Sequence, residues 1–499
     1  MKIPAADALL TVAEMARADA LTIAGGTPGI TLMEAAGRGV ARCVQRRYVP
    51  GPVSVLCGPG MNGGDGFVVA RILSEAGWPV RVGLLGSRDR LTGDAALAAQ
   101  AWAGPVEPVS TALLDGAALV VDALFGAGLN RELAGEALKV IQAARERARD
   151  GTLKVVAIDV PSGVEGDTGR ILGDAAPADM TVTFFRAKPG HLLLPGRALT
   201  GVVRVIDIGI EPSVLDEISP SQGRNGPTSW ARGLAQPGMS DHKYRRGHAV
   251  IAAGGVMTGA ARLAAMAARR IGAGLLTIAP PASAGPLFRS AAPGFLVDDC
   301  DTRDECAAVL ADPRRNAVLV GPGNGLEART RDFAEAALDT DKAVVLDADA
   351  LTLFAGEAEA LAERRAGTVV ITPHDGEFAR LFPDLKGLGK LERTRVAARR
   401  SNAVVVLKGA DTVIAAPDGT ALINANAPPC LATGGTGDVL AGTVLGLLAQ
   451  GMGGFEAAAA AVWLNGAAAQ AIGEGLIAED IPDHLAAMAV AARRTLALT

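Results

Sequence analysis

Short apolar runs alternate with longer amphipathic stretches along the first two hundred residues of the chain. Four of these runs lack polar alternation, as strands buried on both faces do: VSVLCG (53–58), VRVGLLG (80–86), ALVVDALFG (118–126) and KVVAIDV (154–160). Between them, residues 64–77 and 132–150 carry apolar side chains at helical spacing. The pattern predicts an α/β unit with a parallel sheet, whose last strand lies near residues 201–210.

The same alternation returns in the second half of the chain. Six further apolar runs predict strands: 248–255, 274–281, 317–323, 343–351, 368–374 and 403–409. A hairpin is expected around Asp418-Gly419, and three helical stretches close the chain. We therefore predict two α/β domains, each a three-layer αβα sandwich and the first Rossmann-like.

A segment rich in proline and glycine separates the two halves. Between residues 211 and 241 the alternation stops, and Pro212, Pro220, Pro227 and Pro237 occur together with two glycines. We therefore place a linker at residues 214–240, between a domain of residues 1–213 and a domain of residues 241–499.

Composition narrows the class of protein. The chain has 499 residues, of which 49% are apolar and 20% charged, with a formal charge of −5, so we expect a globular protein without a nucleic-acid footprint. Five scattered cysteines without a C-x-x-C pair indicate free thiols in a reducing compartment. The acidic N-terminus does not resemble a signal peptide, and the apolar run 439–454 is too short and glycine-rich for a membrane span. We expect a cytoplasmic protein that binds no membrane.

The stretch CGPGMNGGDG, residues 57–66, connects a predicted strand to a predicted helix. Such a loop can bring backbone amides against a phosphate, although a tight turn capped by Asp65 would give the same pattern. Asp122 and Asp159 lie at the ends of two further predicted strands, with Ser162 just after the second, and in an open parallel sheet such strand ends face one crevice. Asn62, Asp122 and Ser162 could supply oxygen ligands to a hard cation, which leaves Asp159 as a candidate acid/base.

A second glycine loop, CLATGGTGDVLAG, precedes the apolar helix near the end of the chain. The amides of Gly434, Gly435 and Gly437 would form an anion hole at the start of that helix. Asp438 in the first turn could merely complement the helix dipole. Beside a glycine-rich anion hole, we favour a base placed for phosphoryl transfer.

The first half resembles the N-terminal epimerase domain of the bifunctional NAD(P)H-hydrate repair enzymes. The resemblance rests on CGPGMNGGDGFVVAR, VVDALFGAG, AIDVPSG, KPGHLL and LMEAAGRGV. It implies interconversion of the R and S hydrates of NADH and NADPH, a potassium ion (K⁺) held by Asn62, Asp122 and Ser162, and Asp159 as acid/base. The implied substrate contacts are Met61, Asn62, Gly63, Gly64, Asp65, Gly126, Ala127, Gly128, Leu129, Asn130, Arg131, Glu132 and Asp159. Met61 replaces the first of two asparagines usual in this loop, and we expect only its backbone to contact substrate.

The second half resembles the ribokinase-like NAD(P)H-hydrate dehydratase domain. The resemblance rests on GTGD, LVGPGNG, VVLDADALTLF, ITPHDGEFARL and VVVLKGADTVIAAPDG and covers nearly all of residues 225–499. It implies that ADP, accompanied by Mg²⁺, phosphorylates the C6 hydroxyl of the S hydrate, and that phosphate is then expelled. The implied general base is Asp438, and the implied substrate contacts are Ala260, Gly325, His374 and Asp438. The implied nucleotide-binding residues are Lys408, Gly409, Ala410, Asp411, Thr412, Gly434, Gly435, Thr436 and Gly437.

Some positions depart from the pattern, and other functions compete. Asp375 stands where the family commonly has proline, and Pro428, Pro429 and Cys430 replace a smaller run, which bears on loop rigidity and nucleotide preference. His374 has a simpler reading as a capping or core histidine. A vitamin-precursor kinase with an accessory first half, or a nucleotide-sensing module without catalysis, would share the second glycine loop. A kinase would not predict the Asn62, Asp122, Asp159 and Ser162 set. We also expect a homo-oligomer.

Overall fold

The computed structural model describes residues 2–364 and 367–496 and divides into two compact units. The first unit comprises residues 8–220, and the second comprises the described residues up to Asp7 together with those from Ser221 onward. Asp7 joins the second unit because the amide of Arg224 donates to its carbonyl at 2.8 Å. The boundary between residues 220 and 221 falls inside the predicted linker 214–240. Regular structure flanks this boundary: helix α6 (Val214–Ile218) belongs to the first unit and strand β8 (Gln222–Arg224) to the second.

The first unit is built on a seven-stranded, fully parallel sheet in the order β3-β2-β1-β4-β5-β6-β7. Its strands are β1 (Val53–Cys57), β2 (Val80–Leu84), β3 (Val106–Pro108), β4 (Leu119–Ala123), β5 (Lys154–Ile158), β6 (Met180–Phe184) and β7 (Val202–Ile206). The order reverses between β1 and β4, so the loops after these strands open onto one crevice at the carboxyl edge.

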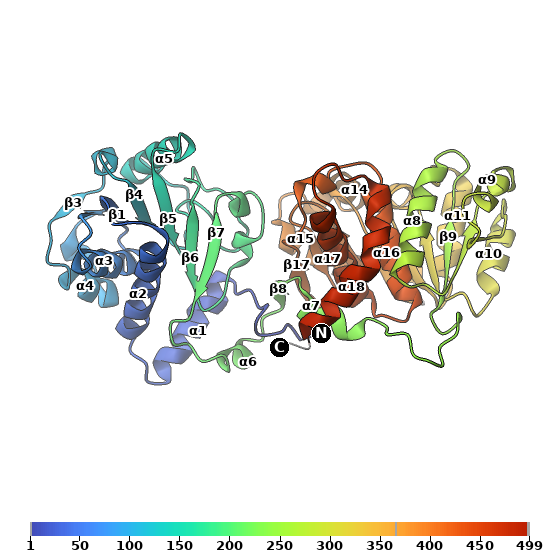
Figure 1. Ribbon diagram of the computed structural model, residues 1–499, viewed down its shortest axis with the longest axis horizontal. Helices are drawn as coiled ribbons and strands as arrows, with labels where there is room; N and C mark the ends of the chain where they lie inside the picture. The colour runs from blue at the N-terminus through green and yellow to red at the C-terminus, as the bar shows by residue number, and fades with distance from the viewer. Residues whose placement is uncertain (1, 365–366, 497–499) are drawn as a thin grey trace. The chain divides into compact units, whose positions relative to one another are not determined.

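Helices cover both faces of this sheet (Figure 1). They are α1 (Val12–Ala24), α2 (Gly29–Arg47), α3 (Met61–Glu75), α4 (Gly93–Gln100), α5 (Gly135–Arg149) and the short α6. Because strand side chains alternate, Val55 and Cys57 face α3 at Gly66, whereas Leu56 lies in the cluster that contains Val140 of α5. The predicted three-layer Rossmann-like architecture is confirmed.

The second unit carries a ten-stranded sheet in the order β11-β10-β9-β12-β13-β14-β15-β16-β17-β8. Its strands other than β8 are β9 (His248–Ala252), β10 (Leu275–Ala279), β11 (Leu296–Val297), β12 (Ala317–Val320), β13 (Ala343–Leu346), β14 (Val369–Ile371), β15 (Val404–Leu407), β16 (Val413–Ala415) and β17 (Ala421–Ile423). Only β16 runs antiparallel to its neighbours, and the β16–β17 turn at Asp418-Gly419 is the predicted hairpin.

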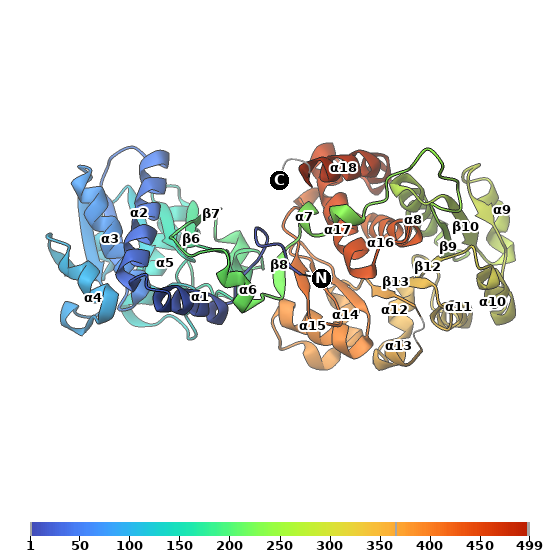
Figure 2. The ribbon, with the colours of Figure 1, turned by 90° about the horizontal axis from the view of Figure 1, so that it is seen from below.

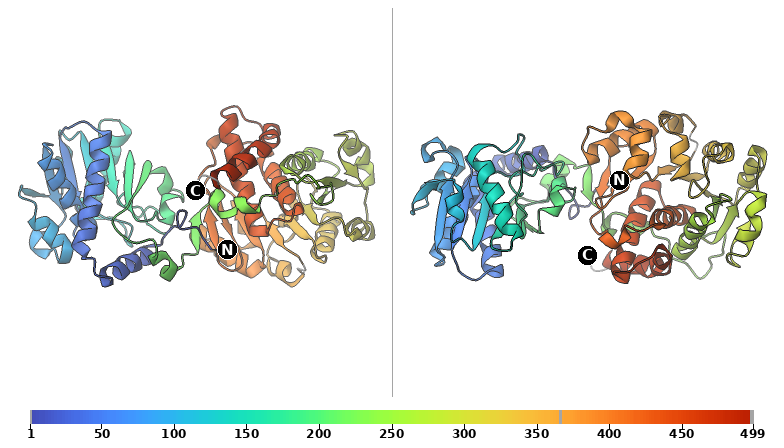
Figure 3. Two further views of the ribbon diagram at one scale, coloured as in Figure 1. Left: turned by 60° about the horizontal axis from the view of Figure 1, so that its bottom comes forward. Right: turned by 90° about the horizontal axis from the view of Figure 1, so that it is seen from above.

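Two helical layers enclose this sheet, as Figure 2 shows from below. Helices α8 (Thr258–Ile271), α16 (Thr436–Ala449), α17 (Gly454–Ile472) and α18 (Ile481–Leu496) lie on one side. The opposite side carries α10 (Arg303–Ala311), α11 (Ala328–Leu338), α12 (Asp349–Leu353), α13 (Glu359–Arg364), α14 (Asp375–Leu381) and α15 (Lys390–Ser401); the short α7 (Pro227–Trp230) and α9 (Gly285–Arg289) complete the unit. Figure 3 gives two further views of both units.

The closing helices form core rather than membrane spans. Gly442 and Gly446 of α16 let the backbone of α8 approach, since a β-carbon at Gly442 would lie 2.1 Å from the carbonyl oxygen of Ala264. Within the described residues no helix is long and apolar enough to cross a membrane. All five cysteines are free, as predicted.

Candidate active sites

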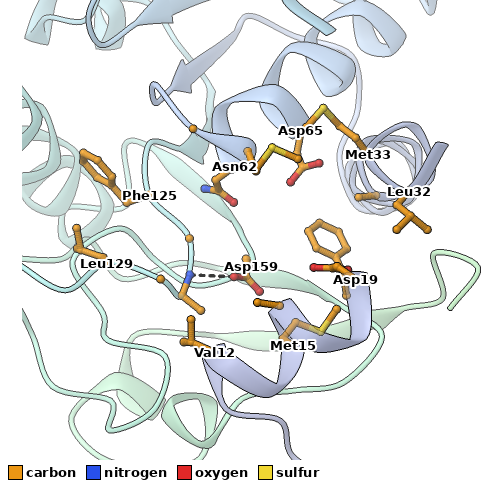
Figure 4. A pocket seen from close by; sticks show the side chains of 18 of the residues that line it. Val12, Met15, Asp19, Leu32, Met33, Asn62, Asp65, Phe125, Leu129 and Asp159 are labelled. Carbon is orange, nitrogen blue, oxygen red and sulfur yellow. Dashed lines mark hydrogen bonds between the residues drawn. The ribbon is translucent and has the colours of Figure 1, made fainter. Parts of the chain in front are cut away.

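A cavity of about 690 Å³ opens at the carboxyl edge of the first sheet (Figure 4). Its floor comes from the loops after β1, β4 and β5, and helices α1 and α2 contribute a largely apolar wall with Val12, Met15 and Leu32. The volume is in the range of cavities that hold cofactor-sized ligands. The cavity thus lies at the strand ends where the sequence pattern predicts a ligand crevice.

Asp159 is the most constrained residue of the cavity. It follows β5 with φ at +67°, a conformation that side-chain-bearing residues rarely adopt. Its amide donates to the carbonyl of Val182 at 2.7 Å, and its own carbonyl lies 2.7 Å from Nε2 of His191. Hydrogen bonds on both sides of the Cα thus hold the strained backbone and fix the direction of the carboxylate.

The Asp159 carboxylate has three donors. Oδ1 accepts from Nζ of Lys188 at 2.6 Å and from Oγ1 of Thr183 at 2.9 Å, and Oδ2 accepts from the amide of Ala127 at 2.9 Å. Burial alone would raise the pKa of Asp159, but Lys188 and the Ala127 amide lower it to about 2. Asp159 is therefore an ionised, oriented base at neutral pH.

His191 supports this arrangement as a neutral side chain. Burial and the nearby Lys188 lower the pKa of His191 to about 4. Nδ1 accepts from the amide of Lys188 at 2.9 Å, so Nε2 carries the proton and donates to the carbonyl of Asp159. The segment KPGH thus positions both the cation and the backbone of Asp159.

Most of the predicted substrate contacts line the cavity, but three do not. The lining includes Met61, Asn62, Asp65, residues 126–131 and Asp159. Gly63, Gly64 and Glu132 are absent from it. A β-carbon at Gly63 would lie 1.9 Å from the carbonyl oxygen of Gly58, so this glycine lets the helix start close to the preceding strand. The Met61 side chain lies at the rim and is 55% exposed.

The three predicted cation ligands surround the loop after β4. The hydroxyl of Ser162 donates to Oδ1 of Asp122 at 2.6 Å and lies 3.2 Å from the carbonyl oxygen of Phe125. Asn62 reaches the same loop at Gly126, and its Nδ2 is buried without a partner. Carboxylate, hydroxyl, carbonyl and amide oxygens with one formal charge are a donor set that fits a monovalent hard cation. Within the described residues no group of three or more His, Cys, Asp or Glu side chains could hold a metal ion.

Sequence reasoning gave no role to Asp19 and Lys188, which also line the cavity. Lys188 lies in the KPGHLL string, but nothing in the sequence connected it with Asp159. The face that α1 turns to the cavity could have been recognised in the sequence from its helical spacing. Its residues are Val12, Met15, Ala16, Asp19 and Ile23.

In the second unit, the second glycine loop begins α16 next to a buried charge cluster. Gly435 is the N-cap with φ at +90°, and Asp438 lies in the first turn. Burial and the nearby Asp347 raise the pKa of Asp438 to about 6, although Lys408 opposes this effect. Asp438 is therefore mostly ionised at neutral pH and can accept a proton.

Lys408 is the cation of this cluster. Its Nζ lies 2.8 Å from Oδ1 of Asp347 and 3.9 Å from Oε2 of Glu377. Burial disfavours the ammonium, but Asp347 and Glu377 raise the pKa of Lys408 above its usual value. A β-carbon at Gly437 would lie 3.6 Å from this Nζ, so the charge faces the start of α16.

The other predicted contacts of the second unit have local partners. His374 caps α14, where its Nδ1 accepts from the amide of Gly376 at 2.9 Å, and its side chain is 55% exposed. Asp411 pairs with Lys390 at 2.5 Å. The amide of Gly325 donates to Oδ2 of Asp349 at 2.8 Å. A β-carbon at the nearby Gly323 would lie 3.1 Å from that of Ala260, so Ala260 borders the same loop.

Two family models match the chain, one for each unit. Residues 29–190 match the YjeF-related protein N-terminus, and residues 249–489 match NAD(P)H-hydrate dehydratase.

Similar proteins match along nearly the whole chain. The bifunctional NAD(P)H-hydrate repair enzyme Nnr of Salinibacter ruber is 38% identical, over 96% of this chain and 95% of its own. The protein of the same name from Thermosynechococcus vestitus is 36% identical over 97% of both chains. A crystal structure of the ADP/ATP-dependent NAD(P)H-hydrate dehydratase of Bacillus subtilis, co-crystallised with ATP/Mg²⁺, covers 54% of this chain and 98% of its own at 31% identity, with a TM-score of 0.48.

Proposed function

The chain belongs to the family of bifunctional NAD(P)H-hydrate repair enzymes, and from this premise we propose how its two units act. The first unit interconverts the R and S hydrates of NADH and NADPH. The second unit converts the S hydrate back to NAD(P)H while ADP becomes AMP and phosphate. The match to full-length repair enzymes across 96% of the chain carries this proposal.

In the first unit, the hydrated nicotinamide ring enters the cavity and Asp159 serves as acid/base. Lys188 and the Ala127 amide hold the carboxylate in one orientation, so little reorganisation is needed when a proton moves. Asn62, Asp122 and Ser162, with the carbonyl of Phe125, would hold the potassium ion. Bound there, the cation would supply positive charge to fix polar groups of the substrate.

In the second unit, Asp438 removes the proton of the C6 hydroxyl as its oxygen attacks the β-phosphate of ADP. The amides of Gly434 to Gly437 and the ammonium of Lys408 stabilise the charge on the transferring phosphoryl group. The lone pair of the ring nitrogen then expels phosphate, which is a far better leaving group than hydroxide, and loss of a proton from C5 forms the ring double bond of NAD(P)H. Lys408 to Thr412 bind the nucleotide, Ala260, Gly325 and His374 contact the hydrate, and Mg²⁺ accompanies the ADP.

The test follows the absorbance of reduced nicotinamide after the full chain is mixed with an R/S mixture of NADH hydrate, ADP and Mg²⁺. The wild type should restore all the hydrate, and Asp438→Asn should restore none. Asp159→Asn should restore the S fraction rapidly and the remainder only at the rate of spontaneous epimerisation. If the wild type restores nothing with either ADP or ATP, the repair function is wrong.

A further inference from the structure

Three carboxyl groups of the epimerase cavity have no hydrogen-bond partner within the described residues. They are Asp19 on α1, Asp65 on α3 and Asp94 on α4, which all line the cavity. Asp159 on the same cavity has three donors. Figure 4 shows the carboxyl groups of Asp19, Asp65 and Asp159 directed toward the same space from three different elements.

Asp19 is the only charged residue on the face that α1 turns to the cavity. Its companions on that face are Val12, Met15, Ala16 and Ile23, with apolar side chains. A partnerless carboxyl on an otherwise apolar wall is costly unless it is neutral or meets a polar ligand. The surroundings therefore fit a group that exchanges a proton with a bound substrate.

Resting on the proposed epimerase function, we propose that Asp19 is a second catalytic acid/base, which acts on the face of the ring opposite Asp159. An epimerase must break and remake a bond on both faces of one carbon. A single oriented carboxylate serves one face, so a second proton-transfer group is needed on the other.

The step is balanced as follows. The carboxylic acid of Asp19 gives its proton to the C6 hydroxyl, the C6–O bond breaks, and water leaves. The lone pair of the ring nitrogen forms the N1=C6 bond of an iminium cation, which lies between two carboxylates. Water then adds to C6 from the other face, Asp159 accepts its proton, and the π pair returns to nitrogen. Asp159, with its lowered pKa, then gives its proton to solvent, and Asp19 takes one up from solvent, which resets the site for the next turnover.

The pKa of Asp19 supports its role as the acid of this step. Burial raises the pKa of Asp19 to about 6, although Lys188 opposes it, so a fraction of Asp19 is protonated at neutral pH. Burial and the neighbouring Asp159 raise the pKa of Asp65 well above its usual value. Asp94 and Arg131 also line the cavity, and on α6, which packs against α1, Asp216 and Glu217 are exposed.

The experiment measures epimerisation of a single hydrate epimer by the full chain without ADP, with chromatographic separation of R and S. Asp19→Asn should lower kcat by about 100-fold or more with little change in KM. The wild-type rate from R to S, the direction in which Asp19 releases the hydroxyl, should fall as pH rises above about 6, and Asp19→Asn should lose this slope. The matched control is Asp94→Asn, because Asp94 is another carboxylate of the same cavity and lies beside the start of α2. This variant should keep the wild-type dependence of the rate on pH. In H₂¹⁸O, one solvent oxygen should enter the hydroxyl per turnover.

The proposal is overturned if Asp19→Asn keeps the wild-type rate or slope, if only KM rises, or if no solvent oxygen is incorporated. Dehydration of S hydrate with ADP and the melting temperature of each variant report on folding, and Asp19→Glu should recover part of the rate. Absence of epimerisation by the wild type would instead refute the proposed function.

Discussion

A methyl group at Gly126 would test the geometry of the epimerase cavity without disturbing its backbone. A β-carbon there would lie 3.1 Å from Oδ2 of Asp159 and 3.2 Å from Oδ1 of Asn62. Both distances are shorter than ordinary van der Waals contact, so each side chain must move by a few tenths of an ångström. The methyl would also enter the cavity beside the carboxylate that we propose as acid/base.

We expect Gly126→Ala to lower kcat/KM of epimerisation by about 100-fold, which corresponds to about 2.7 kcal/mol of transition-state stabilisation. The reason is misplacement: Oδ2 of Asp159, which accepts from the Ala127 amide, moves away from its donor. The assay is chromatographic separation of the two epimers after incubation without ADP. Dehydration of S hydrate by the same sample reports on the intact second unit.

Gly128→Ala is the matched control in the same loop. A β-carbon at Gly128 would meet only Cγ1 of Val12 at 3.8 Å, which is ordinary contact. This variant should lose much less activity. Equal losses for the two variants, or wild-type activity of Gly126→Ala, would refute the dependence of epimerisation on the position of the Asp159 carboxylate.

Three further substitutions act on the charged groups. Asp438→Asn should abolish dehydration and leave epimerisation intact, and the wild-type dehydration rate should fall as pH drops below about 6, because the base becomes protonated. Lys408→Met should move that fall to higher pH, because Lys408 lowers the pKa of Asp438, and rate–pH profiles measure this shift. Because its pKa is lowered, ionised Asp159 stabilises the fold above about pH 4, and this stabilisation is lost toward pH 2. Lys188→Met should leave the buried carboxylate without its cation and so lower the free energy of unfolding by about 3–5 kcal/mol at pH 7, and by less toward pH 5. Hydrogen exchange of the amides in β5 and β6 measures this loss.

Most of the sheet could be predicted because parallel strands buried on both faces are continuous apolar runs. Strand β6 was missed because Thr181 and Thr183 alternate with apolar residues and suggest an exposed face. Both threonines are buried, and their hydroxyls bond to the carbonyl of Thr200 and to Asp159. Strand β8 was read as linker because it has three residues and follows a proline.

The site was predictable where it depends on strand ends and not where it depends on distant elements. Asp122 lies near the carboxyl end of β4, and Asn62 and Asp159 follow β1 and β5, so a parallel sheet brings these positions to one edge. Asp19 comes from a helix 140 positions before Asp159 in the chain, and only the packing of α1 against the sheet brings the two carboxyls to one cavity. Local sequence patterns carry no information about which cavity a helix face will line.

Asp19 and Asp438, two of the three proposed catalytic carboxyls, need opposite protonation states for the same substrate. Asp19 must carry a proton to release the C6 hydroxyl, whereas Asp438 must have lost one to activate that hydroxyl toward phosphate. Burial raises the pKa of both groups to about 6, so each has a populated working form near neutral pH. Restoration of the R epimer requires both units in sequence, so its rate should be limited by epimerisation at high pH and by dehydration at low pH. Starting instead from the S epimer should remove the high-pH limit alone, because that substrate bypasses Asp19.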